Sequence, residues 1–438
     1  MKCNRGDLGQ LAPRKKLLKS WRVILQGKPK ALQAVLLGGL FVFVPERRLV
    51  KDRYDRKGEV VSPLEPTFEG DYSFAHDHPF QLDAGGGLQP INLHYAIYGR
   101  LNHQHDNAIL VCHALSGSAR IADWWPEMIG DGRAFDTRKY CVLGINVPGS
   151  CYGSTGPTTI NPQTGRAYVA DFPLISVSDI VRAQARLVID HLGINKLYAV
   201  VGGSIGGMQA LEWALRFPDH LEKCISIGST PLAAMGLALN HLQRTAIQND
   251  PQWQNGSYAG HEAPVAGLAL ARAIAMCSYK SAGLFNDRFE RRPNRNGEKP
   301  GKSMTDRFDV AGYLDYQAET FTRRFDANSY LILSKAMDTF DLAQNGESDF
   351  ETIRKIQAHL LLIGISSDWL FPAHDVQLLT ERLQSNGADA KYAELRSSHG
   401  HDGFLADANL LAPLIRRFLS VSRNTRRLFR VAGVGACA

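Results

Sequence analysis

The chain is poor in the features that mark disulfide-stabilised, zinc-binding or membrane-spanning proteins. It has 7 cysteines in 438 residues, an odd number, and no two of them form a C-x-x-C pair. This excludes a disulfide framework or a zinc site, and we expect reduced thiols and no metal. The only long apolar run, residues 34–44, is too short to cross about 30 Å of hydrocarbon as a helix. A basic segment follows it where an export signal would have small residues, so we expect a cytoplasmic protein without a membrane anchor.

Acidic residues are scarce only at the two ends of the chain. The net charge of +7 combines +11 in residues 1–57, +6 in residues 411–438 and −10 in residues 58–410. Because the body is acidic, the basic balance does not indicate a nucleic-acid partner. Hydrophobic residues at 44% and charged residues at 21% also exclude a disordered, collagenous or coiled-coil chain.

Short apolar runs alternate with helical patterns from about Phe80 onward, where the organised body is expected to begin. Strands are predicted around 93–97 and at 108–112, 140–146, 197–201, 224–227, 360–365 and 391–395; helices are predicted at 177–192, 205–217, 375–384 and 410–419. Gln184 is the one polar break on the apolar stripe of the first of these helices. The alternation predicts an α/β fold with a mostly parallel sheet covered on both faces.

The alternation stops between residues 231 and 345, where helical patterns dominate. The segment is predicted to be a helical insertion between two strands that covers the site at the strand ends. The predicted organisation is a basic, poorly ordered extension at 1–65, a first core part at 66–230, the insertion at 231–345, a second core part at 346–420 and a basic tail at 421–438.

The strongest chemical signal is Gly202-Gly-Ser-Ile-Gly206, a G-x-S-x-G sequence between a buried strand and an amphipathic helix. In this context the strand-to-helix turn is so tight that side chains at Gly202 and Gly206 would clash. The turn lifts the hydroxyl of Ser204 above the sheet, and the helix N-terminus supplies positive potential beneath it. We therefore predict that Ser204 is a catalytic nucleophile.

A serine nucleophile needs a base and an orienting acid, expected in the order Ser, Asp, His. Asp368 follows a buried strand directly, which places it at the same rim of the sheet as the elbow. The base is expected to be His399 or His401 in the loop before the last helix, and we favour His401 because a flanking glycine frees its backbone.

Attack on an acyl group also requires two donors for the oxyanion. The backbone N–H of Ile205 is one candidate, and that of Leu115, in the loop after an earlier strand, is the other. His113 comes too early in the chain for the base, so we expect a structural role. These residues indicate acyl transfer through a Ser204 acyl-enzyme, but they leave open whether water or another nucleophile receives the acyl group.

Longer motifs make the pattern more specific, and together they resemble the homoserine O-acyltransferases, α/β-hydrolase-fold enzymes of methionine biosynthesis. The matching segments lie between about 80 and 420: His113–Gly117, Trp124–Trp125, Asn146–Val147, Cys151–Pro157, Asp171–Pro173, Gly202–Ala214, Asn240–Ile247, Arg324–Tyr330, Ser367–Pro372 and Gly400–Leu405. The departures are Ile205, where the family usually has Met, Pro148 and Ser150 before Cys151, and His399.

The resemblance implies that Ser204, Asp368 and His401 form a catalytic triad and that residues 231–345 are a helical lid. It also implies that Arg244 holds the carboxylate of the amino-acid substrate, for which a guanidinium is well suited. Asp402 is a further candidate for contact with homoserine. A homodimer paired through the lid helices is implied as well.

The implied reaction is a ping-pong transfer of an acetyl group from acetyl-CoA, as co-substrate with no bound cofactor, to L-homoserine. Three alternatives stay open at this point: succinyl-CoA as donor, serine as acceptor, and a serine esterase of the same fold. One methylene separates homoserine from serine, which is worth only about 1–3 kcal/mol in a pocket. Residues 1–65 have no counterpart in the family, and we expect them to be a dispensable extension that was translated upstream of the true start.

Overall fold

The computed structural model describes residues 64–343 and 348–421, together with two short strands near the N-terminus. The chain divides into two compact units, residues 1–62 and residues 63–438. In the first unit β1 (Leu36–Leu37) pairs antiparallel with β2 (Leu40–Phe41). The predicted tail at 421–438 and nearly all of the predicted extension at 1–65 lie outside the described residues. Everything below concerns the second unit.

The second unit is built on one eight-stranded sheet. Its strands, in spatial order, are β14 (Ala390–Leu395), β13 (His359–Ile365), β12 (Leu221–Ile227), β11 (Leu197–Gly203), β7 (Ala108–Cys112), β8 (Cys141–Ile145), β6 (Ile91–Tyr98) and β3 (Phe68–Phe74). All neighbours from β14 to β8 are parallel, whereas β6 is antiparallel to both β8 and β3. The predicted mostly parallel sheet is confirmed.

The short apolar runs form central strands because both of their faces are buried. In β7, Ala108, Leu110 and Cys112 belong to one hydrophobic core. The intervening Ile109 and Val111 belong to the other core, on the opposite face. The first core is closed by α2 (Val177–Ala185), α3 (Ile205–Arg216) and α10 (Ala373–Ser385), and the second by α1 (Ile121–Trp124), α11 (Gly403–Ala406) and α12 (Ala408–Ser420).

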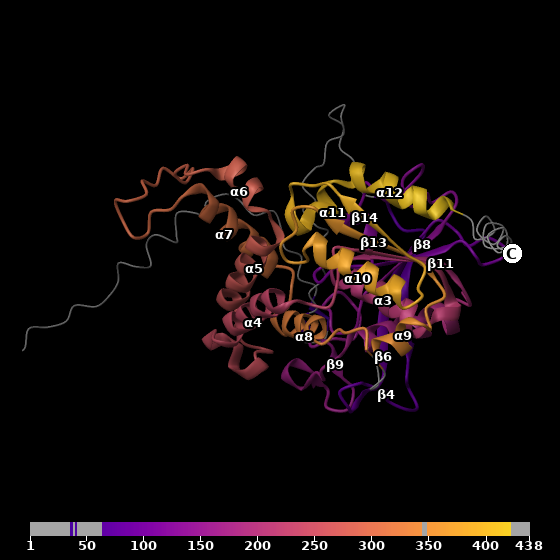
Figure 1. Cartoon of the computed structure of the whole chain (residues 1–438). Coiled ribbons are helices and arrows are strands. Elements are labelled where there is room, and N and C mark those ends of the chain that lie inside the picture. Colours follow the sequence, from indigo (N-terminus) through magenta and orange to yellow (C-terminus); the bar gives the residue numbers. More distant parts are fainter. Residues whose placement is uncertain (1–35, 38–39, 42–63, 344–347, 422–438) are drawn as a thin grey trace, which may run out of the picture. The chain divides into compact units, whose positions relative to one another are not determined.

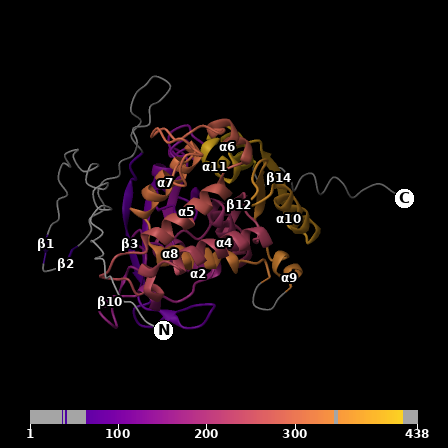
Figure 2. The same cartoon turned by 90° about the vertical axis from the view of Figure 1, so that its left-hand side faces the viewer.

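A block of helices separates β12 from β13 in the chain, as predicted. It contains α4 (Ala234–Gln248), α5 (Val265–Tyr279), α6 (Ala282–Phe289), α7 (Asp309–Thr322), α8 (Ala327–Asp338) and α9 (Asp349–Ile353). Figure 1 shows α4 to α8 on one side of the sheet, and Figure 2, turned toward this side, shows α4, α5, α7 and α8 packed together. We call residues 231–345 the lid; that it acts as one stays a prediction.

The smaller elements lie mainly in the connections. They are β4 (Phe80–Gln81), β5 (Gly87–Leu88), β9 (Ile160–Asn161), β10 (Arg166–Ala167), η1 (Val169–Asp171), η2 (Arg186–His191), η3 (Pro218–His220), η4 (Pro251–Gly256) and η5 (Gly400–Asp402). The helix predicted at 177–192 is α2 continued by the wider helical turns of η2. None of the helices in the described part of the chain is long and apolar enough to span a bilayer.

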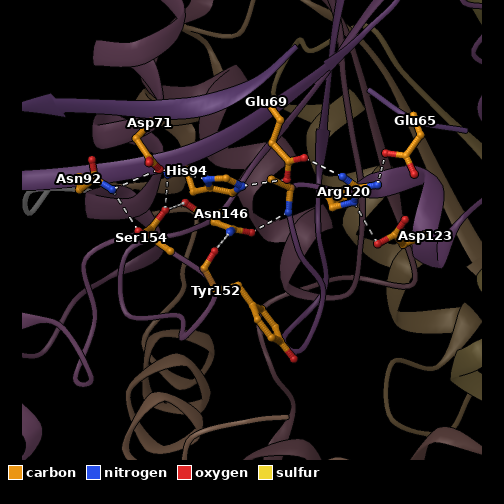
Figure 3. A network of polar contacts seen from close by, with 12 residues as sticks. Glu65, Glu69, Asp71, Asn92, His94, Arg120, Asp123, Asn146, Tyr152 and Ser154 are labelled. Carbon is orange, nitrogen blue, oxygen red and sulfur yellow. Dashed lines mark hydrogen bonds and ion pairs between the residues drawn. The ribbon is translucent and has the colours of Figure 1, made fainter. Parts of the chain in front are cut away.

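The expectation that the organised body begins near Phe80 is wrong, although the predicted core part at 66–230 includes the earlier strand β3. The organised body begins before Phe80, because β3 already pairs with β6 over its whole length. Figure 3 shows one reason why this polar strand is held: Glu69 and Asp71 of β3 contact the two ring nitrogens of His94 on β6. Glu69 also pairs with Arg120, whose second partner, Glu65, lies ahead of the strand. Polar contacts to His94 and an ion pair with Arg120 therefore hold the edge strand in place.

Candidate active site

Ser204 stands at the turn between β11 and α3 with an unusual backbone. Its φ of 60° and ψ of −131° lie in a region that residues with a side chain rarely adopt. The N–H of Ser204 donates to the carbonyl of Ile227 at 3.0 Å, which holds the turn against β12. Strain retained at a serine between a strand and a helix is the geometry of a nucleophile elbow.

The glycines on either side of Ser204 are required by close backbone approach. A Cβ atom at Gly202 would lie 2.1 Å from the carbonyl oxygen of Gly206, and one at Gly206 would lie 2.3 Å from that of Cys112. Both distances are far below van der Waals contact and both involve backbone, which cannot move aside. Side chains at Gly202 and Gly206 would therefore clash with the backbone, as predicted from the G-x-S-x-G spacing.

His401 and Asp368 are hydrogen-bonded to each other in the protein interior. Nδ1 of His401 lies 2.7 Å from Oδ2 of Asp368, and both side chains are buried. Oδ1 of Asp368 accepts the N–H groups of Leu370 and Phe371, at 2.9 and 3.0 Å. With the carboxylate fixed in this way, Nδ1 carries the proton and Nε2 keeps its lone pair for a substrate or for Ser204.

Contacts around His401 place the pair at the same rim of the sheet as Ser204. A Cβ at Gly228, the residue after Ile227, would lie 3.3 Å from Oδ2 of Asp368 and 3.5 Å from Nδ1 of His401. Gly203 packs against the ring of Phe404, whose centroid is 5.8 Å from that of His401. Nε2 of His401 is buried and has no hydrogen-bond partner within the described residues, so it is free to act as a base.

Two opposing effects set the pKa of His401. Burial lowers it, because the imidazolium loses its hydration. The charge and the hydrogen bond of Asp368 outweigh burial, and the pKa of His401 is raised above its ordinary value. His399, the other candidate base, pairs instead with Asp407 at 2.9 Å. The structure thus brings Asp368 together with His401, as favoured from the sequence, and not with His399.

The two predicted oxyanion donors lie where a helix begins and where a loop turns. Ile205 is the first residue of α3, and N–H groups at a helix N-terminus have no partner inside the helix. Leu115 lies in the tight turn that Gly117 closes by donating to the carbonyl of Ala114 at 2.8 Å. No acceptor for the Leu115 N–H is recorded in residues 64–343 and 348–421. We call residues 113–119 the oxyanion loop.

His113 anchors this loop rather than acting as a base. Its Nδ1 contacts the carbonyl of Ala114 at 2.8 Å, and its Nε2 lies 3.3 Å from the N–H of Val147. A neutral ring that donates from Nδ1 and accepts at Nε2 satisfies both contacts. Burial lowers the pKa of His113 to about 4, so the ring stays neutral at physiological pH. This agrees with the structural role expected from the sequence.

The two predicted substrate contacts are both occupied by partners from the protein. Arg244 in α4 forms an ion pair with Asp338 of α8 and also contacts the hydroxyl of Ser334. Asp402 lies 2.7 Å from the ammonium of Lys280. Neither arrangement tests the predicted roles in substrate binding, which stay predictions.

Arg272 is a candidate that sequence reasoning missed. It is the one charged residue of α5. Its guanidinium lies over the rings of Phe321 and Tyr279, 4.8 and 5.6 Å from their centroids, and the ring of Tyr279 lies 5.7 Å from that of His401. Its Nε is buried without a hydrogen-bond partner, and among the described residues no carboxylate pairs with it. The sequence signal that could have indicated this residue is a single arginine in an otherwise uncharged, largely apolar helix.

The lid is docked onto the loop that carries His401. Lys280 pairs with Asp402, and its carbonyl accepts the indole N–H of Trp369 at 3.1 Å. The hydroxyl of Ser281 donates to the carbonyl of Ser398. Gly400 has a φ of +69°, and a Cβ there would lie 2.6 Å from the nitrogen of Ser281. The junction of α5 and α6 therefore forms one wall of the site.

No group of three or more histidine, cysteine, aspartate or glutamate side chains in the described residues could hold a metal ion. The groups that the described residues bring to the site are a strained serine, a buried imidazole with its carboxylate, and N–H donors at a helix start and a loop turn.

Comparisons with known proteins agree with this geometry. A family profile described as alpha/beta hydrolase fold matches residues 107–407. A curated homoserine O-acetyltransferase from Symbiobacterium thermophilum is 45% identical over 354 residues, which cover 78% of this chain and 92% of that protein. A crystal structure of homoserine O-acetyltransferase from Bacillus anthracis has a TM-score of 0.76 and 27% identity, covering 81% of this chain and 98% of that chain.

A crystal structure of esterase E22 is almost as similar in shape. It has a TM-score of 0.73 and 27% identity, and covers 81% of this chain and all (100%) of that chain. Shape alone therefore does not separate a transferase from an esterase, whereas the 45% sequence identity does.

Proposed function

We propose, from the premise that this chain belongs to the homoserine O-acetyltransferase family of the α/β-hydrolase fold, that it transfers an acetyl group from acetyl-CoA to the hydroxyl of L-homoserine. The observation that carries the proposal is the 45% identity over most of the chain, combined with a strained Ser204 at the same rim as a buried His401–Asp368 pair. In the cell this places the protein in methionine biosynthesis, with the cytoplasm as its proposed location.

The first half of the reaction forms an acetyl-enzyme. Nε2 of His401 takes the proton of the Ser204 hydroxyl, and the serine oxygen attacks the thioester carbonyl of acetyl-CoA. The N–H groups of Leu115 and Ile205 stabilise the oxyanion. Coenzyme A leaves as the tetrahedral intermediate collapses, with the proton returned by His401. Asp368 orients the imidazole and stabilises its charged form throughout.

The second half uses the same groups in reverse. His401 removes the proton from the hydroxyl of homoserine, whose oxygen attacks the acetyl-enzyme, and Ser204 is regenerated. Coenzyme A acts as the leaving group of a co-substrate, so the proposal needs no resident cofactor. The lid wall formed by Tyr279, Lys280 and Ser281 supports the exclusion of water from the acetyl-enzyme.

Arg272 and Arg244 are two alternatives for binding the carboxylate of homoserine. Arg244 was expected from the resemblance, but its guanidinium is already paired with Asp338 and would have to bind the substrate carboxylate as well. Arg272 has no competing carboxylate in the described structure and reaches His401 through Tyr279. We therefore add Arg272 to the proposed substrate site. Asp402 stays a proposed contact for the ammonium group of homoserine, which would take the position that the ammonium of Lys280 occupies beside Asp402.

The decisive experiment is to follow free thiol when the purified protein meets homoserine with acetyl-CoA or with succinyl-CoA. We expect thiol release with acetyl-CoA that depends on homoserine. Thiol release only with succinyl-CoA would show that succinyl-CoA, not acetyl-CoA, is the donor. A stronger response to serine than to homoserine would show that serine is the acceptor. Rapid hydrolysis of p-nitrophenyl esters without any response to homoserine would identify an esterase and overturn the proposal.

We also propose a homodimer formed through the lid. Large apolar side chains are exposed on the packed helices α4 and α5: Met235 (59%), Leu242 (52%), Val265 (53%) and Leu270 (55%). Exposed large apolar side chains on two neighbouring helices favour association with a second copy of the chain. Light scattering should give twice the chain mass, and Leu242→Glu with Leu270→Glu should give a monomer. A monomeric unsubstituted protein at micromolar concentration would contradict the proposal.

A further inference from the structure

We propose that Arg324, a lid residue, is a positioning residue for the oxyanion loop: it holds the carbonyl of Ser116 and so fixes the direction of the Leu115 N–H. The inference rests on the proposed function, because it assigns Leu115 to the oxyanion. It adds that the lid takes part in building the oxyanion hole.

Arg324 reaches the loop from the short connection between α7 and α8. Its Nη1 donates to the carbonyl of Ser116 at 3.1 Å and contacts the hydroxyl of Tyr152 at 2.5 Å. The guanidinium also lies over the ring of Phe321, 5.1 Å from the centroid. Hydrogen bonds from a charged donor are stronger than neutral ones, so this contact is well suited to restrain a backbone carbonyl.

Tyr152 is itself held in place from the sheet side. Its carbonyl accepts the amide N–H of Asn146, and Oδ1 of Asn146 accepts the N–H of Ala119 at 2.6 Å. Figure 3 shows Asn146 between Tyr152 and Ser154, with the phenol ring of Tyr152 extending away from this network. Asn146 thus fixes the end of the oxyanion loop and, through Tyr152, the hydroxyl that Arg324 contacts.

The beginning of the loop is held by a buried amide chain that explains Gln184, the polar break in α2. The amide of Gln184 donates to Gln209 at 2.8 Å, and Gln184 accepts the indole N–H of Trp213 at 2.9 Å. Gln209 in turn donates to the carbonyl of His113 at 3.4 Å. The loop is therefore anchored at His113 by α3 and at Ala119 by Asn146.

Between these two anchors, Ser116 is the point where a cationic side chain holds the loop. The Ser116 carbonyl belongs to the same peptide unit as the Gly117 N–H, which donates at 2.8 Å to the carbonyl of Ala114, and that carbonyl shares a peptide unit with the Leu115 N–H. Holding the Ser116 carbonyl therefore restrains the Leu115 N–H through this hydrogen bond. An oxyanion donor acts only when it is within about 2.7–3.1 Å of the developing charge. Without Arg324 the middle of the loop would rely on its own turn, and the donor would be placed less accurately.

The test compares Arg324→Ala with Arg323→Ala, a matched control. Arg323 is the preceding residue, and it pairs with Glu319 on the surface. Each variant is assayed with acetyl-CoA and homoserine and, separately, for the burst of p-nitrophenol from p-nitrophenyl acetate, which contains neither coenzyme A nor homoserine. Thermal unfolding confirms that the variants fold.

We expect Arg324→Ala to lower kcat about 10- to 100-fold with both donors, at nearly unchanged KM, because a misplaced oxyanion donor affects every acyl transfer. Arg324→Lys should restore part of the rate, Tyr152→Phe should cost less than Arg324→Ala, and Arg323→Ala should stay within about 2-fold of the unsubstituted enzyme.

Three outcomes would overturn the proposal. A raised KM for acetyl-CoA with a normal p-nitrophenol burst would make Arg324 a coenzyme A contact, and a raised KM for homoserine alone would make it an acceptor contact. If Arg323→Ala and Arg324→Ala both change kcat only slightly and by the same factor, Arg324 has no positioning role. If the unsubstituted protein shows no homoserine-dependent thiol release, the proposed function fails, whereas the p-nitrophenol burst still tests Arg324.

Discussion

Nδ1 of His401 lies 2.7 Å from Oδ2 of Asp368, although 33 residues separate them in the chain. Asp368 follows β13 and His401 follows β14, and these strands are parallel neighbours at one edge of the sheet. Because the carboxyl ends of parallel strands meet at one rim, the two loops lie side by side. The pair is therefore a direct product of the sheet topology.

Ser204→Ala should abolish acetyl transfer. The substitution removes the proposed nucleophile, and such losses are on the order of 10⁴–10⁶ in kcat. Homoserine-dependent release of coenzyme A measures the effect, and circular dichroism controls for folding. A variant that keeps more than a few per cent of the rate would refute the triad.

The pH dependence of kcat/KM should report the raised pKa of His401. The imidazole must be neutral to act as a base, so the rate should rise with pH through a midpoint above about 6.5, the ordinary histidine value. In Asp368→Asn the charge that raises the pKa is lost while burial remains, so the midpoint should move to lower pH. The rate at the optimum should fall by about 10⁴. An unchanged midpoint in this variant would show that another group titrates.

Gly202→Ala should destroy the elbow. The added methyl would overlap the carbonyl of Gly206 at 2.1 Å, so the turn must open, at a cost of about 3 kcal/mol or more. Gly283→Ala in α6 is the control, because its Cβ would meet only one side-chain atom, at 3.9 Å, and alanine favours a helix by about 0.5–1 kcal/mol. Urea unfolding compares the two; similar stabilities would contradict the steric explanation.

Arg272→Lys should raise the KM for homoserine about 10- to 100-fold, since a planar guanidinium binds a carboxylate through two bonds and an ammonium does not. Arg244→Lys serves as the comparison, because the structure commits Arg244 to Asp338. The p-nitrophenol burst should stay normal in both. If Arg244→Lys has the larger effect on homoserine, the original expectation for Arg244 holds and that for Arg272 fails.

Deletion of residues 1–62 should leave both activity and thermal stability unchanged. This boundary lies between the two compact units and keeps Glu65, which pairs with Arg120 at 2.7 Å. A cut at residue 65 would remove that ion pair. Loss of most of the activity in the shorter protein would show that the basic extension contributes to the enzyme.

The sequence was sufficient to predict the tight turn at Ser204 and the pairing of Asp368 with His401, which depend on local geometry and chain order; their catalytic roles stay a prediction. Ser204 follows from its glycines, and Asp368 and His401 follow from their places after the last two parallel strands. For Arg272 the sequence offers only a lone arginine in an apolar helix, because its surroundings depend on tertiary contacts: its guanidinium lies over Phe321 and Tyr279, and Tyr279 in turn lies beside His401. The pairing of Arg244 with Asp338 likewise joins helices 94 residues apart.

The strand β3 was missed for a different reason. Residues 68–74 do alternate apolar and polar side chains, but they include Gly70, Glu69 and Asp71, which are uncommon in strands. Their acidic side chains are exposed and face His94 and Arg120. Partners of this kind are a property of the assembled sheet and are not visible in the segment itself.

The order of the strands also has a consequence for synthesis on the ribosome. Ser204 lies ahead of the lid, whereas the strands that deliver Asp368 and His401 are β13 and β14, the last two of the chain. A chain that ends within the lid contains Ser204 but neither Asp368 nor His401, the proposed orienting acid and base. If the proposed triad holds, the site is therefore assembled only when the last two strands of the chain, β13 and β14, have been added to the sheet.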